Sequence, residues 1–565
     1  MRLIVVNKLG KVTIGNINHK LGDISTFFYF CRMINWKRIP ILLLSMLNPN
    51  WNRSSKFSFF YVRFLSVFLF LISSESSYTQ NPVWLISTNP STLTNLKIKV
   101  QTEGIKIRCE SEWLHSISID LPSKFDINRF CLENNCTAQP VLNLKSSSLS
   151  MINSTHLDMA IEQMNGEAFI KEGLSGLGVK VGVTDAGYMY LNDSNRMPDL
   201  SHLWIGKQIK GTHDFVNNLD TIAYHETYYT RRKADYKARK NWLRQLRKEL
   251  KLIYHSHGTE VLKMITGIDS GGNYQIGLAP NAAYYLTRTE DGVKEFKEEE
   301  DYYIAALEWM HQQGVRVINT SLGYGRGRKI KGSNYSPMEM NGESMIAKAV
   351  QIACTEKNML VVVAAGNDGD KRKWRVISTP ADAEAALTVG SVLGRFQKTG
   401  YSGIGPEFNS YLKPDVCCYS YQGTSLSAPA VCGFAACVLE ANPSLSANEL
   451  KQLIVRSSHL YPYGNNFIGY GVPLANRALQ LLEYPDMKFS NTKEIHLKER
   501  SFKLDTIDVS IPTLTIFHKK NDVHVLTQEV IARDKKSNSF IICPPKEAKR
   551  STVQVGYFIY ELFWE

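Results

Sequence analysis

Residues 359–367 read Met-Leu-Val-Val-Val-Ala-Ala-Gly-Asn, a short apolar run that ends at a polar side chain. Apolar runs of about four to eight residues are typical of strands that are buried on both faces of a parallel sheet. Similar runs occupy 179–184, 282–287, 315–319 and 387–392, and helical patterns occupy 302–313 and 345–356. This alternation predicts an α/β fold with a doubly wound parallel sheet, in which sites form at the carboxyl ends of the strands.

The chain of 565 residues exceeds what one hydrophobic core usually organises, so we expect several units. Short mixed patterns before a serine-rich link at 146–150 indicate a small α+β unit. Strand-like segments at 507–511, 513–517 and 553–560 indicate a small β module without visible chemistry. The predicted regions are an N-terminal extension with a signal peptide (1–80), the α+β unit with its linker (81–150), the α/β domain (151–483) and the C-terminal β module (484–565).

The N-terminal region has the residue pattern of an export signal. Arg53, Lys56 and Arg63 precede an apolar run at 64–72, and several serines follow it. This order is typical of a secretory signal peptide, and initiation at Met46 would give it a positively charged start of ordinary length. A membrane-spanning helix is the alternative, but the run is shorter than the roughly 20 apolar residues that a span needs. We expect a secreted or cell-envelope protein.

The formal charge of +13 is concentrated in two segments. Residues 1–80 contain ten Lys/Arg and two Asp/Glu, and residues 231–251 contain the same numbers, so the remainder carries 13 − 16 = −3. The body of the protein is therefore not basic, and nucleic-acid binding is not expected. The stretch 231–251 is predicted to be a solvated surface helix, with contact to an anionic surface as the alternative.

The ten cysteines include no Cys-x-x-Cys motif, which argues against a zinc ribbon or a thioredoxin-like site. Two pairs could oxidise outside the cytosol, but the sequence assigns no disulfide. These pairs are Cys131 with Cys136 and Cys417 with Cys418, whereas Cys354, Cys432 and Cys437 are predicted to be small core residues.

Polar motifs interrupt the apolar scaffold. Asp185-Ala-Gly ends a predicted strand, His257-Gly-Thr opens a helix, and Gly-Thr-Ser425 opens another. A serine hydroxyl needs a base to take its proton when it attacks a carbonyl, and histidine suits that task. A carboxylate such as Asp185 can orient the imidazole, and the Asn367 amide with the Ser425 N–H can stabilise the negative charge that develops on the carbonyl oxygen.

The order Asp, His, Asn, Ser within D-x-G, H-G-T, A-A-G-N and G-T-S-x-S-x-P resembles the subtilisin family of serine proteases, peptidase S8, over about 175–482. The resemblance implies a serine endopeptidase that acts on protein or peptide substrates and needs no cofactor, although structural calcium is common in the family. The unit at 95–145 is similar to propeptides of secreted Bacteroidetes-type members, which implies that the protein is made as a precursor and binds its own propeptide. A permanent N-terminal domain is the alternative for this unit. The resemblance also implies two extended segments beside the substrate main chain: Ser321, Leu322 and Gly323, and Ala364, Ala365 and Gly366.

Some alternatives remain open at the level of sequence. His255 competes with His257 for the role of base, although only His257 is followed by Gly-Thr. Few residues separate Val416 from Gly423, fewer than the family usually has, so the geometry beside the serine is uncertain. A catalytically inactive binding protein on the same fold is therefore the second hypothesis.

Overall fold

The computed structural model describes residues 2–6, 12–16, 80–122, 125–141, 159–222, 255–269, 275–290, 299–325, 335–505, 511–534 and 539–565. The chain divides into two units, Met1–Ser77 and Tyr78–Glu565. The first contains an antiparallel pair, β1 (Arg2–Val6) and β2 (Val12–Asn16). The predicted signal segment, the link at 146–150 and the basic stretch 231–251 lie outside the described residues.

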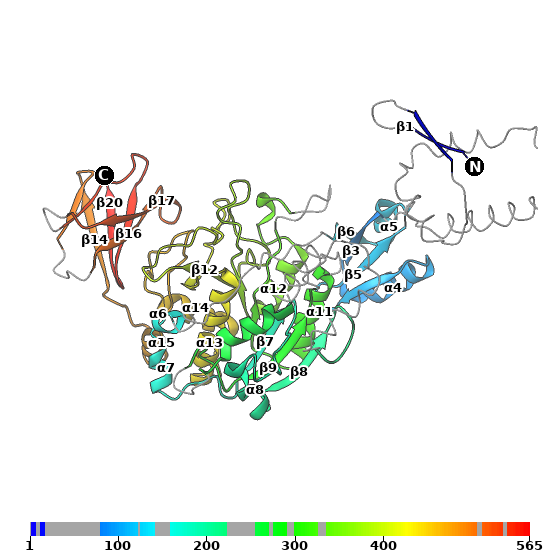
Figure 1. Cartoon of the computed structure of the whole chain (residues 1–565), viewed down its shortest axis with the longest axis horizontal. Coiled ribbons are helices and arrows are strands. Elements are labelled where there is room, and N and C mark those ends of the chain that lie inside the picture. Colours follow the sequence, from blue (N-terminus) through cyan, green and yellow to red (C-terminus); the bar gives the residue numbers. More distant parts are fainter. Residues whose placement is uncertain are drawn as a thin grey trace, which may run out of the picture. The chain divides into compact units, whose positions relative to one another are not determined.

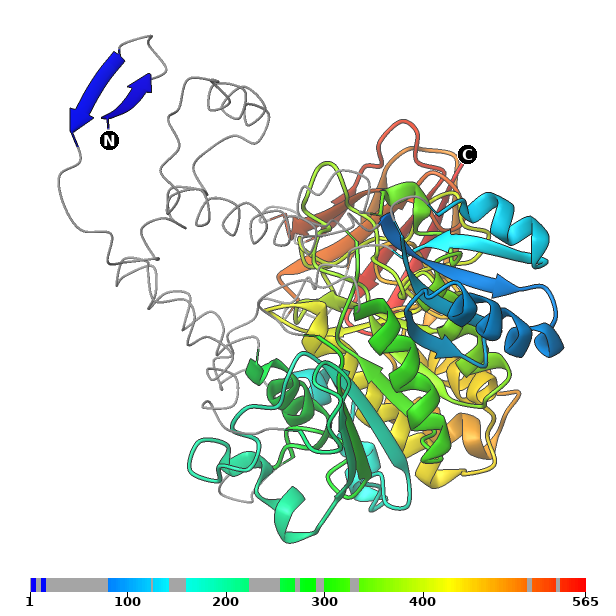
Figure 2. The same ribbon diagram turned by 90° about the vertical axis from the view of Figure 1, so that its right-hand side faces the viewer.

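The second unit is built around a parallel sheet with the order β13-β12-β11-β10-β7-β9-β8 (Figures 1 and 2). Every neighbouring pair in this sheet is parallel, which confirms the predicted doubly wound α/β class. The strands are β7 (Lys180–Asp185), β8 (Ile209–Asp214), β9 (Ala283–Arg288), β10 (Val317–Thr320), β11 (Leu360–Ala364), β12 (Leu387–Val392) and β13 (Val416–Tyr419).

Alternate residues of the central strands belong to two separate hydrophobic clusters. In β11, Leu360 and Val362 belong to one cluster, and Val361 and Val363 belong to the other. Successive side chains of a strand point to opposite faces, so both faces of the sheet are covered. This double burial explains why the sequence of β11 is continuously apolar.

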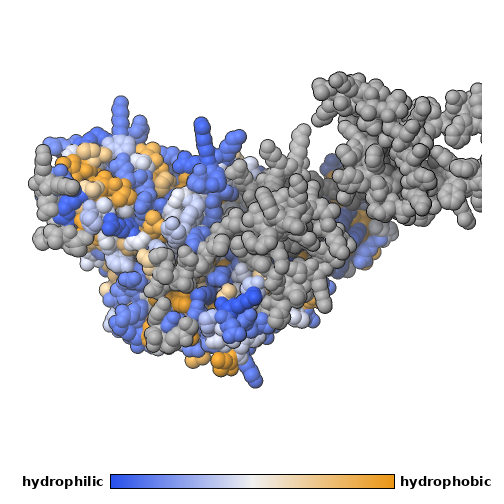
Figure 3. Space-filling model, in the orientation of Figure 1, coloured by the Kyte–Doolittle hydropathy of each residue, from blue (hydrophilic) through white to orange (hydrophobic). Residues whose placement is uncertain are grey.

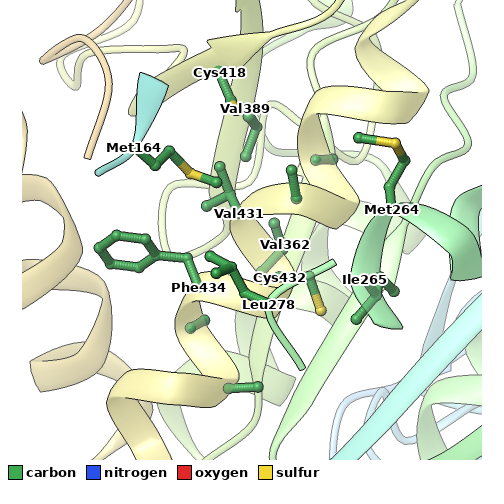
Figure 4. Packing of buried hydrophobic residues seen from close by; sticks show 14 of the residues in the cluster. Met164, Met264, Ile265, Leu278, Val362, Val389, Cys418, Val431, Cys432 and Phe434 are labelled. Carbon is green, nitrogen blue, oxygen red and sulfur yellow. The ribbon is translucent and has the colours of Figure 1, made fainter. Parts of the chain in front are cut away.

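Helices supply the two covering layers. The first cluster includes α13 (Thr424–Ala441), and Figure 4 shows Val431, Cys432 and Phe434 of this helix among Val362, Val389 and Leu278. The second cluster includes α11 (Glu299–Gln312) and α12 (Met345–Thr355). By length and composition α13 could cross a membrane, but most of it is buried in this core.

Two further helices follow α13. A capping box begins α14 (Ala447–Ser457): Ser446 Oγ accepts from the Glu449 N–H, and the Glu449 carboxylate accepts from the Ser446 N–H. The next helix is α15 (Ala475–Glu483). Cys354, Cys432 and Cys437 are buried, as predicted.

Residues 80–141 form a four-stranded antiparallel sheet of order β4-β5-β3-β6. Its strands are β3 (Gln80–Ser87), β4 (Ile107–Ser111), β5 (Ser116–Leu121) and β6 (Cys136–Pro140), and its helices are α4 (Leu93–Thr102) and α5 (Ile127–Glu133). This sheet packs on α11: the Arg108 guanidinium lies 2.8 Å from an Asp301 oxygen, and Ser111 Oγ donates to Glu308 at 2.5 Å.

The C-terminal segment forms a five-stranded sheet of order β14-β20-β19-β16-β17 and a small β15-β18 pair. Its strands are β14 (Thr492–Leu497), β15 (Phe502–Leu504), β16 (Thr513–Lys519), β17 (Val525–Ala532), β18 (Phe540–Ile542), β19 (Arg550–Val555) and β20 (Phe558–Trp564). Figure 3 shows apolar and polar surface interspersed over this module. The predicted strand 553–560 is wrong because the chain turns at Gly556, whose φ is +62°. Residues 507–510 of the predicted strand 507–511 lie outside the described ranges.

Candidate active site

Asp185 and His257 form a buried hydrogen-bonded pair. Asp185 is the last residue of β7, and His257 lies in the helical stretch 255–266. His257 Nδ1 lies 2.8 Å from Asp185 Oδ1 and 3.0 Å from Asp185 Oδ2. The Ala186 N–H also donates to Asp185 Oδ1, at 2.7 Å. The imidazole is therefore held through Nδ1, and among the described residues its buried Nε2 has no hydrogen-bond partner.

Two glycines allow the helix of His257 to approach the end of β7. The Gly258 N–H donates to the Gly187 carbonyl at 2.9 Å. A Cβ atom at Gly258 would lie 2.7 Å from that carbonyl oxygen, and one at Gly187 would lie 2.7 Å from the His255 carbonyl oxygen. The glycines of D-x-G and H-G-T thus have a shared physical role: they bring histidine and aspartate within hydrogen-bond distance.

The electrostatic surroundings of His257 favour its protonated form. Burial lowers the pKa of His257, but the adjacent Asp185 carboxylate opposes this effect through charge and hydrogen bonding. Glu290 and Glu260 add further negative charge, and the pKa of His257 lies above its ordinary value. A raised pKa strengthens the imidazole as a proton acceptor while requiring a higher pH to keep it neutral.

Ser425 lies in the first turn of α13 and is 2% exposed. Gly423, two residues before the serine, is the N-cap of the helix, and its φ of +148° is a backbone conformation that residues with a side chain rarely adopt. The short connection from β13 is held by Ser420, whose hydroxyl donates to the Gly423 carbonyl at 2.7 Å. The Ser420 carbonyl in turn accepts from Ser391 Oγ at 2.9 Å, so the shortened segment is fixed rather than open.

Asn367 follows β11 and is oriented by the residue before the serine. Its Oδ1 accepts from the Thr424 N–H at 2.9 Å and from Thr424 Oγ1 at 3.0 Å. The Thr424 hydroxyl also accepts from the Gly366 N–H at 3.1 Å. These contacts identify Oδ1 as the accepting end of the amide and Nδ2 as its donating end. Sequence reasoning gave Thr424 no role of its own, although the G-T-S motif contains it.

The register of the sheet brings these two groups of residues together. Thr320 of β10 pairs with Thr184 of β7, so Ser321 and Asp185 leave neighbouring strands at the same level. Adjacent strands lie about 4.8 Å apart. Ser321 Oγ donates to the Ser425 carbonyl at 2.8 Å, which connects α13 to this edge. The four residues thus lie at or beyond the carboxyl ends of strands of the same sheet: Asp185 ends β7, Ser321 follows β10, Asn367 follows β11 and Ser425 follows β13.

The other residues that the sequence singled out lie close to these side chains. His255 is also buried, but the histidine that contacts the Asp185 carboxylate is His257. The segments 321–323 and 364–366 are buried and flank the serine: Ser321 contacts Ser425, and Gly366 contacts Thr424. Across the described ranges, no group of three or more His, Cys, Asp or Glu side chains is placed to hold a metal ion.

A parallel α/β sheet with an Asp–His pair and a helix-borne serine at one edge defines a class of serine hydrolases. The model of the subtilase family matches residues 176–471, more than half of the chain. Subtilisin DY from Bacillus licheniformis is 29% identical over 233 residues, which cover 39% of this chain and 76% of that protein. Subtilisin NAT from Bacillus subtilis subsp. natto is 26% identical over 325 residues, covering 56% and 69%.

A solved structure of fervidolysin from Fervidobacterium pennivorans, a keratinolytic enzyme related to subtilisin, aligns with a TM-score of 0.48 and 17% identity, over 85% of this chain and 71% of that one. The sequence matches decide the assignment. The chain belongs to the subtilase family and is a serine-type endopeptidase.

Proposed function

We propose that this endopeptidase cleaves protein or peptide substrates through a triad of Ser425, His257 and Asp185. The single observation that supports this assignment best is the state of His257, which is tied to Asp185 through Nδ1 and keeps Nε2 without a partner in the described part of the chain. In the proposed reaction Nε2 takes the proton of the Ser425 hydroxyl as its oxygen attacks the scissile carbonyl. The same nitrogen then protonates the leaving amine, and water releases the acyl group.

The proposed oxyanion site consists of Asn367 Nδ2 and the Ser425 N–H. The Thr424 contacts support it, since they fix the orientation of the Asn367 amide before any substrate binds. Donors that are already oriented stabilise a developing charge without reorganisation. The N-terminal end of α13 adds a favourable dipole at the same place.

The segment Ser321–Gly323 is proposed to pair with an extended substrate. In the described part of the molecule, the main-chain groups of Leu322 and Gly323 make no hydrogen bond. Such groups can add a substrate strand. The Ala364–Gly366 segment is engaged more fully: the Gly366 N–H donates to Thr424 and its carbonyl accepts from the Gly403 N–H. We propose that it borders the substrate rather than pairing with it along its whole length.

Residues 81–150 are proposed to be a propeptide of a secreted precursor, and 151–483 the catalytic domain. The support is the polar contact of Arg108 and Ser111 with α11. Structural calcium and contact of residues 231–251 with an anionic surface are further proposals that rest on the family resemblance and on composition. The second hypothesis, an inactive binding protein, is disfavoured by membership in a family of active endopeptidases.

Labelling with a serine-directed fluorophosphonate tests the triad. We expect stoichiometric labelling of Ser425 in the full chain, with no labelling and no peptide hydrolysis in Ser425→Ala. The exposed Ser444 provides the matched control, because Ser444→Ala should label like the original chain. Peptide hydrolysis that persists in folded Ser425→Ala would contradict the assignment of the nucleophile.

A further inference from the structure

Proline in the motif after Ser425 leaves a gap in the hydrogen bonding of α13. In a regular helix the carbonyl of residue 425 accepts from the N–H of residue 429. Position 429 is a proline inside the helix, and proline has no N–H. Ser425 is 2% exposed, so water is a poor substitute for the missing donor. A buried carbonyl that loses its donor destabilises the turn that contains it.

The Ser321 side chain fills this gap. Its hydroxyl donates to the Ser425 carbonyl at 2.8 Å, and both groups are buried. The same oxygen accepts from Asn319 Nδ2 at 2.9 Å. Because the Asn319 amide already donates to this oxygen, the hydroxyl proton is left to point at the Ser425 carbonyl. The donor is therefore oriented by β10, on which Asn319 lies, and not by α13 itself.

We propose that Ser321 is a positioning residue, whose side chain fixes the first turn of α13 in place of the donor that Pro429 lacks. That turn contains both the Ser425 hydroxyl and the Ser425 N–H, so a small tilt displaces nucleophile and oxyanion donor together. This inference rests on the proposed function of Ser425. It is separate from any contact of the Ser321 main chain with substrate, because it concerns the hydroxyl alone.

The test is a double-mutant cycle in the full chain with Ser321→Ala, Pro429→Ala and both together. Removal of the hydroxyl should lower kcat for a peptide substrate by about 10- to 100-fold, as displacement of reacting groups does, while KM changes less than about threefold. Alanine at 429 restores a backbone N–H four residues after Ser425. The loss caused by Ser321→Ala should therefore be several-fold smaller in the Pro429→Ala background than in the Pro429 background.

Equal losses in the two backgrounds would overturn the proposal, and so would a rise in KM at unchanged kcat. If Ser321→Ala does not fold, the isosteric pair Ser321→Thr and Ser321→Val decides, because only threonine keeps a hydroxyl donor; equal kcat in that pair contradicts the proposal. The original chain and Ser425→Ala are assayed alongside. Activity that survives in Ser425→Ala removes the proposed function and this inference together, whereas an inactive Ser425→Ala with an unaffected Ser321→Ala removes the inference alone.

Discussion

Three carboxylates surround His257 with negative charge, and their effect on the reaction has a definite sign. The proposed base must be neutral to accept a proton, so kcat/KM rises as the pH rises through the pKa of His257. Asp185, Glu290 and Glu260 stabilise the imidazolium and raise that pKa. We therefore expect the acidic limb of the pH–rate profile to lie above the ordinary histidine range of about 6.5.

Glu260→Gln should move this acidic limb to lower pH, by less than about one pH unit, because it removes the most weakly coupled of the three carboxylates. Measurement of kcat/KM from pH 5 to 10 checks the shift. Glu172→Gln is the matched control, since Glu172 is an exposed residue outside the site. An unchanged or raised midpoint in Glu260→Gln would contradict this electrostatic effect.

At the scale of single residues, the sequence predicted side-chain types better than contacts. The motifs around Asp185 and His257 indicated a carboxylate and an imidazole at converging element ends, and the structure brings them together. The contacts of Thr424 with Asn367 were not predictable, because Thr424 looks like a helix-starting residue whose partner is 57 positions away. The hydroxyl of Ser321 was missed for the same reason, since sequence alone assigned the residue only a main-chain role.

At the scale of elements, the helix 255–266 depends on its close approach to the end of β7. A Cβ atom at position 258 would lie 2.9 Å from Asp185 Cβ as well as 2.7 Å from the Gly187 carbonyl oxygen. Backbone and a buried side chain cannot yield cheaply at such distances. We expect Gly258→Ala to lower kcat/KM by at least about 10-fold and to lower Tm by several degrees.

Peptide hydrolysis and thermal unfolding measure the two effects of Gly258→Ala. Gly400→Ala is the matched control, because a Cβ atom there would meet nothing within 4 Å. Retention of full activity and Tm in Gly258→Ala would show that the helix can move away without harm, and that the H-G-T motif does not need its glycine for close approach.

The contact of β4 with α11 depends on a buried pair of opposite charges. The Arg108 and Asp301 side chains are 5% and 3% exposed, and Ser118 Oγ also donates to the carboxylate, at 3.3 Å. Removing one partner leaves a buried charge without compensation, which typically costs about 3–5 kcal/mol. Arg108→Ala should therefore loosen residues 80–141 from α11.

Limited digestion of the Ser425→Ala chain by an added protease reports this loosening as faster cleavage near residues 80–141. Arg129→Ala is the control, because the Arg129–Glu133 pair is exposed at 75% and 57% and such i,i+4 pairs contribute only about 0.3–0.5 kcal/mol. Equal digestion rates in the two variants would mean that the buried pair does not hold the sheet.

Element boundaries were predictable where periodicity was strong. The central strands were predicted within about two residues because burial on both faces makes them continuously apolar. The edge strand β8 was missed, since Ile209–Asp214 is largely polar, and β13 was missed because four residues give no period. The single strand predicted at 553–560 failed because apolar residues continue on both sides of Gly556, and one glycine was not taken as a turn.

At the scale of the whole molecule, the C-terminal module is joined to the α/β body through a buried histidine. His459 Nε2 lies 2.8 Å from Gln554 Oε1, and Nδ1 accepts from the Val472 N–H at 2.9 Å. The ring also packs against Phe396 of the body and Tyr557 of the module. Such docking could not be predicted, because it depends on partners far apart in the sequence.

This junction predicts a loss of stability in acid. Burial lowers the pKa of His459 to about 4, whereas an unfolded histidine titrates near 6.5. Between these values the unfolded chain binds a proton that the folded chain does not, so stability falls as the pH falls from about 6.5 to about 4. The slope for one proton is about 1.4 kcal/mol per pH unit. His202, with a pKa lowered to about 4 mainly by burial, acts in the same direction.

Denaturant unfolding of the Ser425→Ala chain at a series of pH values measures the slope. His459→Gln should reduce it by about one proton, while His496→Gln, at an exposed position, should leave it unchanged. A slope that is identical in all three chains would mean that His459 becomes protonated in the folded state without penalty.

Because residues 80–141 cover α11, their removal should be detectable by ion-exchange chromatography. This segment contains six Lys/Arg and six Asp/Glu, so the segment itself adds no net formal charge to the chain. Its removal would, however, expose the carboxylates of Asp301 and Glu308 and take away the guanidinium opposite the first. A form that lacks residues 1–141 should therefore be retained longer on an anion-exchange column than a form that begins at residue 80, although the two sequences carry the same formal charge.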